Sequence, residues 1–206
     1  LVDFVSQDRL HIIPLIRTDF SGKELDYVND CLNSGWVSSI GKYVNKFENA
    51  FSQKFNFKHS LCVSSGTTGL QLAFASLGLG LEDEVIVPNF TFAASINSII
   101  HANATPKLVD VNLGSACVDI DTVKKSITKR TKAILLVHLY GNSCDLDDFY
   151  KLRKETGILI IEDCAEALGT RYKGKHVGIN SDAAIFSFFG NKPVSYTHLR
   201  AHETSR

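Results

Sequence analysis

Apolar residues recur along this chain in two alternating patterns. In the stretch GKELDYVNDCLNSG, Leu25, Val28, Cys31 and Leu32 have the spacing of one helix face, and KYVNKFENAFSQKF repeats that spacing with phenylalanines. Between such stretches lie short runs of β-branched and aliphatic residues, which predict strands. By these criteria helices are predicted over residues 22–35, 42–55, 66–78, 92–103, 119–127 and 145–157, and strands over residues 60–65, 84–88, 107–111, 133–141, 158–163 and 183–189.

Several of the predicted strands are continuous apolar runs, such as EVIVP at 84–88 and ILII at 158–161. Such a strand fits a parallel sheet covered on both faces, whereas alternation would mark a strand with one solvated face. Strands that alternate with helices predict an α/β domain of three layers with a mainly parallel sheet. We assign residues 21–192 to this domain, residues 1–20 to an N-terminal arm, and residues 193–206 to a non-native tail outside the fold.

Composition narrows the functional classes. The 206 residues include 22 basic and 22 acidic side chains, which argues against nucleic acid or an anionic membrane as a partner held by bulk charge. No run of about 18 apolar residues predicts a membrane span. The cysteines form no C-x-x-C pair, so we expect buried free thiols, no metal site and a cytoplasmic protein. The chain starts at Leu1 and contains no methionine, and we therefore expect a fragment of a longer protein.

Candidate ligand-binding residues follow the predicted strands, because ligands of doubly wound sheets lie at the carboxyl ends of the strands. After SLCVSS, the small residues Gly66, Thr67 and Thr68 open a helix, where backbone N–H groups and the helix dipole favour an anion such as phosphate. Helix capping by Ser65 or Thr67 explains the same residues equally well. The stretch is not a Walker loop, because no Gly-Lys-Ser/Thr follows it.

Aromatic and ionisable residues follow the other strands. Phe92 comes after EVIVP and either stacks on a planar ligand or belongs to the core, which is the more common place for an aromatic side chain. Glu162 and Asp163 close ILIIED, where a carboxylate either faces a cationic nitrogen or serves as a helix cap or ion-pair partner. His138 follows AILLV, and a lone histidine there more often has a structural role.

Lys192 follows the strand AAIFSFF and a Gly-Asn pair. A lysine at the edge of a core can form a Schiff base, although a lone lysine is more often a solvated surface residue. Together the candidates offer a phosphate site, an aromatic face, a carboxylate for a cationic ring nitrogen and an amine for an aldehyde. Those four features match the four groups by which pyridoxal 5′-phosphate (PLP) can be held.

The chain resembles the DegT/DnrJ/StrS family of nucleotide-sugar aminotransferases, which are PLP-dependent enzymes of fold type I. The stretches that carry the resemblance follow in family order up to residue 192: SGWVSSIGKYVNKFE, VSSGTTGLQLAF, DEVIVPNFTFAASINSIIHANATPKLVDV, VHLYGNSCDLD, IIEDCAEALGTRYKGKHVG and DAAIFSFFGNK. Their wording is most similar to the perosamine-synthase-like branch. The resemblance implies the large PLP-binding domain of an aspartate-aminotransferase-like fold, with the family's C-terminal small domain missing.

The resemblance also implies roles for individual residues. Lys192 would bind PLP covalently and then act as general base and acid, and Asp163 would pair with the pyridine nitrogen. Glu166 would lie near the phenolic oxygen of the ring, where many relatives have glutamine, and Phe92 would stack on the ring. The remaining residues would bind the phosphate (Gly66, Thr67, Thr68 and Ser187) or lie near the substrate (Trp36, Val37 and Ser38).

The implied reaction moves an amino group from glutamate to C4 of a nucleotide-linked 4-keto-6-deoxy sugar, for surface polysaccharide, lipopolysaccharide or glycan biosynthesis. Relatives with histidine in place of the lysine are dehydratases, so Lys192 favours transamination, and family members are usually homodimers. Alternatives are a family member that acts at another sugar position and a non-catalytic PLP-fold fragment or sensor domain. A dinucleotide-binding oxidoreductase fits less well, because the chain lacks the glycine-rich turn with a later acidic residue.

The residues after Lys192 differ from the family pattern. The string THLRAHETSR near the end of the chain resembles translated adapter or vector sequence, which is excluded from reasoning about the fold. We therefore expect the chain to lack half of the family fold and, in this form, to be inactive.

Overall fold

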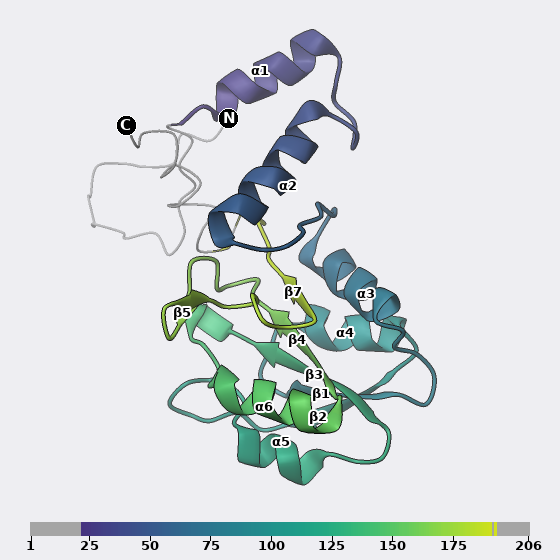
Figure 1. Cartoon of the computed structure of the whole chain (residues 1–206). Coiled ribbons are helices and arrows are strands. Elements are labelled where there is room, and N and C mark those ends of the chain that lie inside the picture. The colour runs from purple at the N-terminus through teal and green to yellow at the C-terminus, as the bar shows by residue number, and fades with distance from the viewer. Residues whose placement is uncertain (1–21, 191, 193–206) are drawn as a thin grey trace, which may run out of the picture.

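A five-stranded parallel sheet forms the centre of the computed structural model, which describes residues 22–190 and 192 (Figure 1). The predicted arm (1–20) and tail (193–206) lie outside the described residues. The strand order is β2-β1-β3-β4-β7. The strands are β1 (Glu84–Pro88), β2 (Thr105–Val109), β3 (Thr131–Val137), β4 (Leu159–Asp163) and β7 (Ala183–Ile185). The helices are α1 (Glu24–Ser34), α2 (Lys42–Phe55), α3 (Gly66–Ser76), α4 (Ala93–His101), α5 (Ile120–Ser126) and α6 (Leu146–Thr156).

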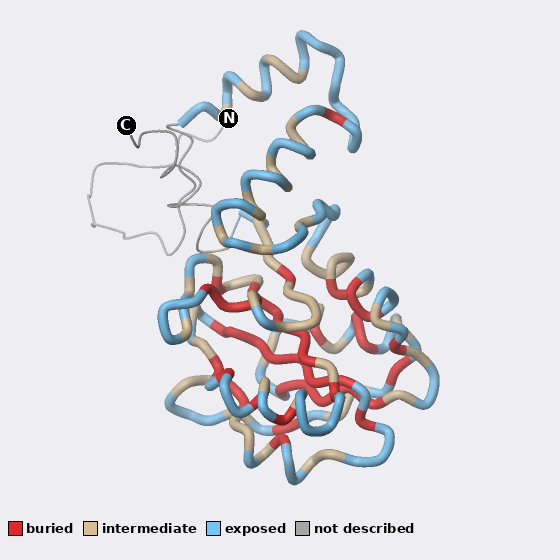
Figure 2. Tube along the Cα trace, in the orientation of Figure 1, coloured by how far each residue is buried: buried red, intermediate tan, exposed pale blue. Residues whose placement is uncertain are grey.

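Helices cover both faces of the sheet and bury it (Figure 2). Ile134 and Leu136 of β3 belong to the core under α5 and α6, whereas Leu135 and Val137 belong to the core under α3 and α4. Successive side chains of a strand point to opposite faces, so the central positions of a strand covered on both faces are apolar. This arrangement confirms the predicted three-layer α/β fold with a parallel sheet.

The strand predicted over residues 60–65 is wrong. This segment is irregular in the structure, and β7 pairs only with β4 among the described strands. Its polar groups bond to α2 instead: the Cys62 N–H donates to Glu48 Oε1 at 2.7 Å, and the Ser60 and Ser52 hydroxyls lie 2.8 Å apart. A β-propensity run becomes a strand only where another strand is available to pair with it.

Two further strands are shorter than the sequence predicts. The run 133–141 leaves the sheet after Val137, where a short 3₁₀ turn (Leu139–Gly141) places Tyr140 at a φ of 54°. The run 183–189 ends as a strand at Ile185, because Phe186 and Phe188 turn to pack against other aromatic rings. A small hairpin of β5 (Arg171–Tyr172) and β6 (Lys175–His176) is present and is not among the predicted elements.

An aromatic cluster joins α2 to the segment after β7. Phe51 lies at its centre, with ring centroids 5.3 Å from Phe186, 6.0 Å from Phe188 and 5.7 Å from Phe57. The cluster consists of Phe47, Phe51, Phe55, Phe57, His176, Phe186 and Phe188. The helical spacing of phenylalanines in α2 therefore has a partner that the periodicity alone could not identify.

The apolar positions of α1 have a different environment. Leu25, Val28 and Leu32 are 70%, 54% and 62% exposed, although the helix forms as predicted and ends at Gly35 with a φ of 71°. A positive φ of this kind suits glycine, which has no Cβ to clash.

Within residues 22–190 and 192, none of the helices has the length and apolar character needed to cross a membrane. All five cysteines are free, as predicted; Cys117, Cys144 and Cys164 are also buried, whereas Cys31 is half-buried and Cys62 exposed, so the predicted burial is wrong for these two.

Candidate active site

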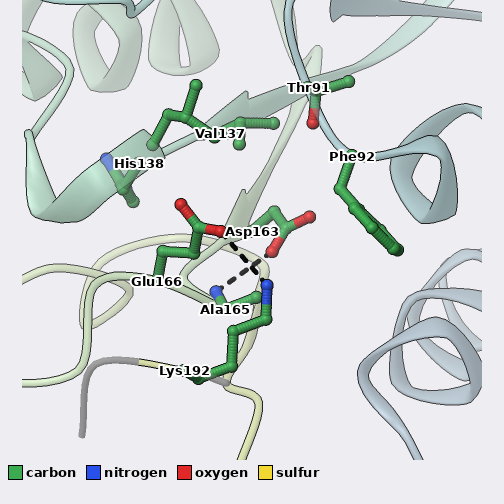
Figure 3. A pocket seen from close by; sticks show the side chains of 9 residues that line it. Thr91, Phe92, Val137, His138, Asp163, Ala165, Glu166 and Lys192 are labelled. Atoms are coloured by element: carbon green, nitrogen blue, oxygen red, sulfur yellow. Dashed lines mark hydrogen bonds and ion pairs between the residues drawn. The ribbon is translucent and has the colours of Figure 1, made fainter. Parts of the chain in front are cut away.

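A pocket lies where β3 and β4 end and the chain leaves β1 (Figure 3). Side chains from three strand ends and from the segment after β7 meet there, as the rule for parallel sheets predicts. The residues that line it are Thr91, Phe92, Val137, His138, Leu139, Asp163, Ala165, Glu166 and Lys192. Five of the residues singled out from the sequence are therefore brought together: Phe92, His138, Asp163, Glu166 and Lys192.

Asp163 is the buried acid of the pocket. It is the last residue of β4, and only 7% of its surface is exposed. Its Oδ2 accepts a hydrogen bond from the Ser95 hydroxyl at 2.9 Å, and its Oδ1 accepts one from the Ala165 N–H at 3.1 Å. Burial raises the pKa of this carboxyl, while the two hydrogen bonds and the charge of Lys192 act in the opposite direction.

Lys192 points into the same pocket. Its Nζ lies 3.1 Å from Glu166 Oε1 and 5.4 Å from the centroid of the Phe92 ring, and 14% of its side chain is exposed. The other Glu166 oxygen accepts the Tyr140 N–H at 3.0 Å, which fixes the carboxylate. The interpretation of Lys192 as an ordinary surface lysine is therefore wrong.

Phe92 is not a core residue, in contrast to the more common fate of an aromatic side chain after a strand. It is 68% exposed and stands directly before α4, with its ring toward the pocket (Figure 3). The ring face and the Lys192 ammonium lie within cation–π distance. Phe92 therefore offers the pocket a flat apolar wall.

Glu162 and His138 form a buried hydrogen-bonded network beside the pocket, and His138 also lines that pocket. His138 Nε2 lies 2.8 Å from Glu162 Oε2, and Nδ1 accepts the Cys144 N–H, so the neutral ring carries its proton on Nε2. Glu162 also accepts bonds from the Tyr150 hydroxyl at 2.6 Å and the Gly178 N–H at 2.6 Å. Both ring nitrogens of His138 therefore have partners, as the structural interpretation predicts. The potential ligand atoms of His138, Glu162 and Cys164 lie within 4.8 Å of one another.

The candidate phosphate residues lie at the start of α3. Ser65 caps the helix: its hydroxyl accepts the Thr68 N–H, and the Thr68 hydroxyl accepts the Ser65 N–H. Gly66 and Thr67 belong to the first turn, whose N–H groups have no partners within the helix itself. Ser187 lies close by, since a Cβ on Gly66 would stand 3.5 Å from the Ser187 Cβ. The fold thus brings Ser187 next to Gly66, although 121 positions separate them in the sequence (187 minus 66).

Trp36, Val37 and Ser38 lie apart from these groups. They form the exposed connection between α1 and α2 and are not among the residues that line the pocket. Sequence reasoning also missed Thr91 and Ser95, which contact each other and, through Ser95, Asp163. Small polar residues at a helix start resemble ordinary caps, so only their place in the fold distinguishes them.

The fold and the pocket define a class of protein that comparison with known proteins identifies. The chain aligns with the aminotransferase from Psychrobacter cryohalolentis at a TM-score of 0.82 and 35% identity, over 87% of this chain and 46% of that one. It aligns with the PLP-form of a putative sugar aminotransferase from Streptococcus pneumoniae at a TM-score of 0.81 and 34% identity, over 87% of this chain and 50% of that one. The fold is thus that of the aminotransferase large domain.

The family follows from the sequence match. Residues 19–198 match the model of the DegT/DnrJ/EryC1/StrS aminotransferase family, and the chain belongs to that family. The GDP-perosamine synthase of Vibrio cholerae is 46% identical over 184 residues, which are 89% of this chain and 50% of the relative. The GDP-perosamine synthase of Escherichia coli O157:H7 is 45% identical over 183 residues, again 89% of this chain and 50% of the relative. The chain spans about half the length of these relatives.

Proposed function

We propose that the pocket binds PLP and that the whole protein is a PLP-dependent transaminase. The observation that carries the proposal is the convergence of the Lys192 amine, the Asp163 carboxylate and the Phe92 ring on one pocket. The resemblance to the PLP-form of the S. pneumoniae protein supports it. Bound PLP supplies an electron sink that stabilises negative charge next to the reacting amine.

The residues present fit this cofactor. Each Asp163 oxygen accepts one protein hydrogen bond, from Ser95 or Ala165, and a carboxylate oxygen can accept more than one. Asp163 can thus pair with a protonated pyridine nitrogen without losing either bond. Phe92 provides a wall for a planar ring, and Gly66, Thr67, Thr68 and Ser187 gather near one helix N-terminus, where a phosphate is favoured.

Lys192 is proposed as the covalent attachment point and the group that moves the proton. A lysine amine must be deprotonated to act as nucleophile or base, and a nearby carboxylate stabilises its charged form. In the described structure Glu166 is that carboxylate, 3.1 Å from Nζ. Glu166 is therefore placed to hold the proton-carrying form of Lys192, and we propose that it also lies near the phenolic oxygen of the ring.

For the substrates we propose glutamate as amino donor and a nucleotide-linked 4-keto-6-deoxy sugar as acceptor, in polysaccharide or lipopolysaccharide biosynthesis. The 46% identity to a GDP-perosamine synthase supports this choice, and Lys192 favours amine transfer over dehydration. We also propose a homodimer, and a place near the substrate for the loop of Trp36, Val37 and Ser38. Amination at another sugar position is the alternative within the same class.

Covalent attachment tests the cofactor proposal. The chain is incubated with PLP, reduced with borohydride and digested, and we expect a phosphopyridoxyl mass on the peptide that contains Lys192. Lys192→Ala should remove the adduct completely, whereas Lys151→Ala, at an exposed lysine of α6 paired with Glu155, should leave it unchanged. An adduct that survives in Lys192→Ala would rule out the assignment.

Substrate amination tests the second part. The gene product at its natural length is given glutamate and either a GDP- or a UDP-linked 4-keto-6-deoxyhexose, and the 2-oxoglutarate and amino sugar formed are measured. We expect amination of the nucleotide sugar and none of simple 2-oxo acids beyond the glutamate half-reaction. If only 2-oxo acids accept the amine, the sugar assignment is wrong while the PLP proposal stands.

A further inference from the structure

Ser95 is a fully buried polar residue beside the pocket. It is the third residue of α4, and its relative exposure is 0%. Its hydroxyl lies 2.9 Å from Asp163 Oδ2, in a contact that spans 68 positions of the sequence. The hydrogen-bond partner of this buried hydroxyl is therefore the acid of the proposed cofactor site.

The hydrogen bonds around Ser95 have one consistent direction. An ionised carboxylate can only accept, so the Ser95 hydroxyl donates to Asp163. The Thr91 hydroxyl lies 2.9 Å from the Ser95 oxygen, and since the Ser95 proton is already used, Thr91 donates to Ser95. The result is a chain of donors from Thr91 through Ser95 to Asp163 Oδ2. Because the Ala165 N–H holds Oδ1, both carboxylate oxygens are fixed.

A second serine on α4 makes a comparison possible. Ser98 lies three residues after Ser95, is equally buried, and donates to the Thr67 carbonyl at 3.3 Å. The two serines therefore have the same side chain, helix and burial, but Ser95 contacts the acid and Ser98 contacts the start of α3. Loss of the Ser98 hydroxyl removes one hydrogen bond, whereas loss of the Ser95 hydroxyl removes two, and only Ser95 bonds to a charged group.

We propose that Ser95 is a positioning residue for the acid of the cofactor site: its hydroxyl, held by Thr91, fixes the orientation of the Asp163 carboxylate and favours its ionised form. This inference rests on the proposed function for its meaning, because an ionised, oriented Asp163 is what a protonated pyridine nitrogen requires. The same segment supplies the Phe92 ring, so residues 91–95 set both the ring wall and the acid.

Other charged groups face Asp163 and must be considered with Ser95. Lys192 approaches from the segment after β7, Glu166 from the turn after β4, and His138 from the end of β3. Burial raises the pKa of Asp163, and the Ala165 and Ser95 hydrogen bonds, followed by the charge of Lys192, lower it. Ser95 is the side chain among these donors that can be deleted without changing a charge.

The test measures the ionisation of Asp163 in the full chain without PLP. Aspartate carboxyl carbons are labelled with ¹³C and titrated by NMR in the unaltered chain, Ser95→Ala, Ser98→Ala and Ser95→Thr. Loss of one hydrogen bond to a charged group should raise the Asp163 pKa by about one pH unit in Ser95→Ala. Ser98→Ala should leave it within about 0.3 unit, and Ser95→Thr, which keeps a hydroxyl, should restore the original value.

A weaker variant keeps the test informative if Ser95→Ala does not fold. Thr91→Val removes the donor that orients Ser95 and should raise the Asp163 pKa by less than Ser95→Ala would. An unchanged Asp163 pKa in both variants, or an equal rise in Ser98→Ala, overturns the proposal. Because no cofactor is present in the titration, failure of PLP to bind would reject the proposed function without changing this result.

The loaded protein gives a second readout. PLP titrations of Ser95→Ala and Ser98→Ala should show a fall in affinity of about tenfold for the first and less than about threefold for the second. If both lose affinity equally, Ser95 has only a structural role in α4. If Ser95→Ala shifts the carboxyl pKa without changing PLP affinity, the positioning role stands and the pairing of Asp163 with the ring nitrogen is wrong.

Discussion

Asp163 and Lys192 lie in one pocket but are held there by different forces. Asp163 ends an inner strand of the sheet, and hydrogen bonds from Ser95 and Ala165 fix its two oxygens. Lys192 follows β7, an edge strand among the described strands; ring contacts between Phe51 and Phe186 or Phe188 anchor the segment that leads to it, and a single hydrogen bond to Glu166 holds its amine. Directional bonds fix an orientation, whereas apolar contacts are non-directional and fix only a position. That difference suits an acid that must stay in place and an amine that must move a proton.

The largest effect on stability is expected from removing the centre of the aromatic cluster. Phe51→Ala deletes a ring within 6.0 Å of five other phenylalanine rings, and we expect a loss of about 3 kcal/mol in the free energy of unfolding. Urea unfolding measures the loss, and amide hydrogen exchange should speed up in residues 186–190 more than in 159–163. Phe90→Ala, at a 48% exposed ring, is the control and should cost less than about 1 kcal/mol. Equal acceleration in both segments would mean that the aromatic cluster does not selectively hold the lysine segment.

A change at the acid should affect cofactor binding and leave the lysine segment unaltered. Asp163→Asn keeps the size of the side chain and removes its charge, so we expect PLP affinity to fall about 10- to 100-fold. Equilibrium dialysis or absorbance titration measures the affinity, with Asp121→Asn on the exposed start of α5 as control. Unchanged affinity would argue that Asp163 does not face the ring nitrogen.

The buried network of Glu162, His138 and Tyr150 should affect the free energy of unfolding and not the PLP affinity. Tyr150→Phe removes the hydroxyl that donates to Glu162 Oε1 at 2.6 Å, and we expect a cost of about 1–2 kcal/mol because a buried carboxylate loses a donor. Thermal or urea unfolding measures it, and Tyr140→Phe, at a 71% exposed side chain, should change nothing. A change in PLP affinity in Tyr150→Phe larger than about twofold would show that the network also supports the pocket.

The smallest expected effects concern the pH dependence of stability, which should have opposite signs for Asp163 in the pocket and His176 in the aromatic cluster. Burial raises the pKa of Asp163 above its ordinary value of 3.8, so the folded chain binds this proton more tightly than the unfolded chain. Its contribution to stability therefore falls as the pH rises from about 3.8 toward the raised value. Asp163→Asn should remove that slope.

His176, in the aromatic cluster, should respond in the other direction. Burial lowers its pKa below 6.5, and its Nε2 accepts the Gly169 N–H at 2.8 Å, which a proton there would displace. The unfolded chain binds this proton more tightly, so stability falls as the pH falls from about 6.5 toward the lowered value. Urea unfolding from pH 4 to 8, compared with His176→Phe, measures this slope. If stability changed with pH in the same direction for Asp163 and His176, the predicted opposite pH dependence would be wrong.

The sheet was predictable because its buried strands are short apolar runs that can be recognised in the sequence. EVIVP and ILIIED are apolar in their central positions, with carboxylates only at their ends, and both form strands within one residue of the predicted ends. The run 60–65, which has serine at both ends, does not form a strand, and its Cys62 N–H bonds to Glu48 of α2 rather than to a neighbouring strand. Local sequence reports a preference for extended structure, and pairing depends on what else the fold brings near.

Candidate residues were predictable where a chemical type is unusual at its position. A carboxylate at the end of a buried strand is costly unless it has a partner, and this identifies Asp163 as a candidate. Ser95 and Thr91 are not identified in this way, because serine and threonine near a helix start are ordinary caps. Glu162 and Asp163 are neighbours of equal promise in the sequence, yet one faces Tyr150 and Gly178 and the other faces the pocket.

The parallel α/β domain and the acid and lysine of the pocket can be predicted from sequence because periodicity and residue type are local properties of the chain, and the family follows from its matching stretches. Which groups meet depends on how the elements pack. The tertiary structure places Ser95 against Asp163, Glu166 against Lys192 and Phe51 against the segment that carries the lysine. Those contacts join residues far apart in the chain, and their partners are set by how strands and helices pack rather than by any pattern within one segment.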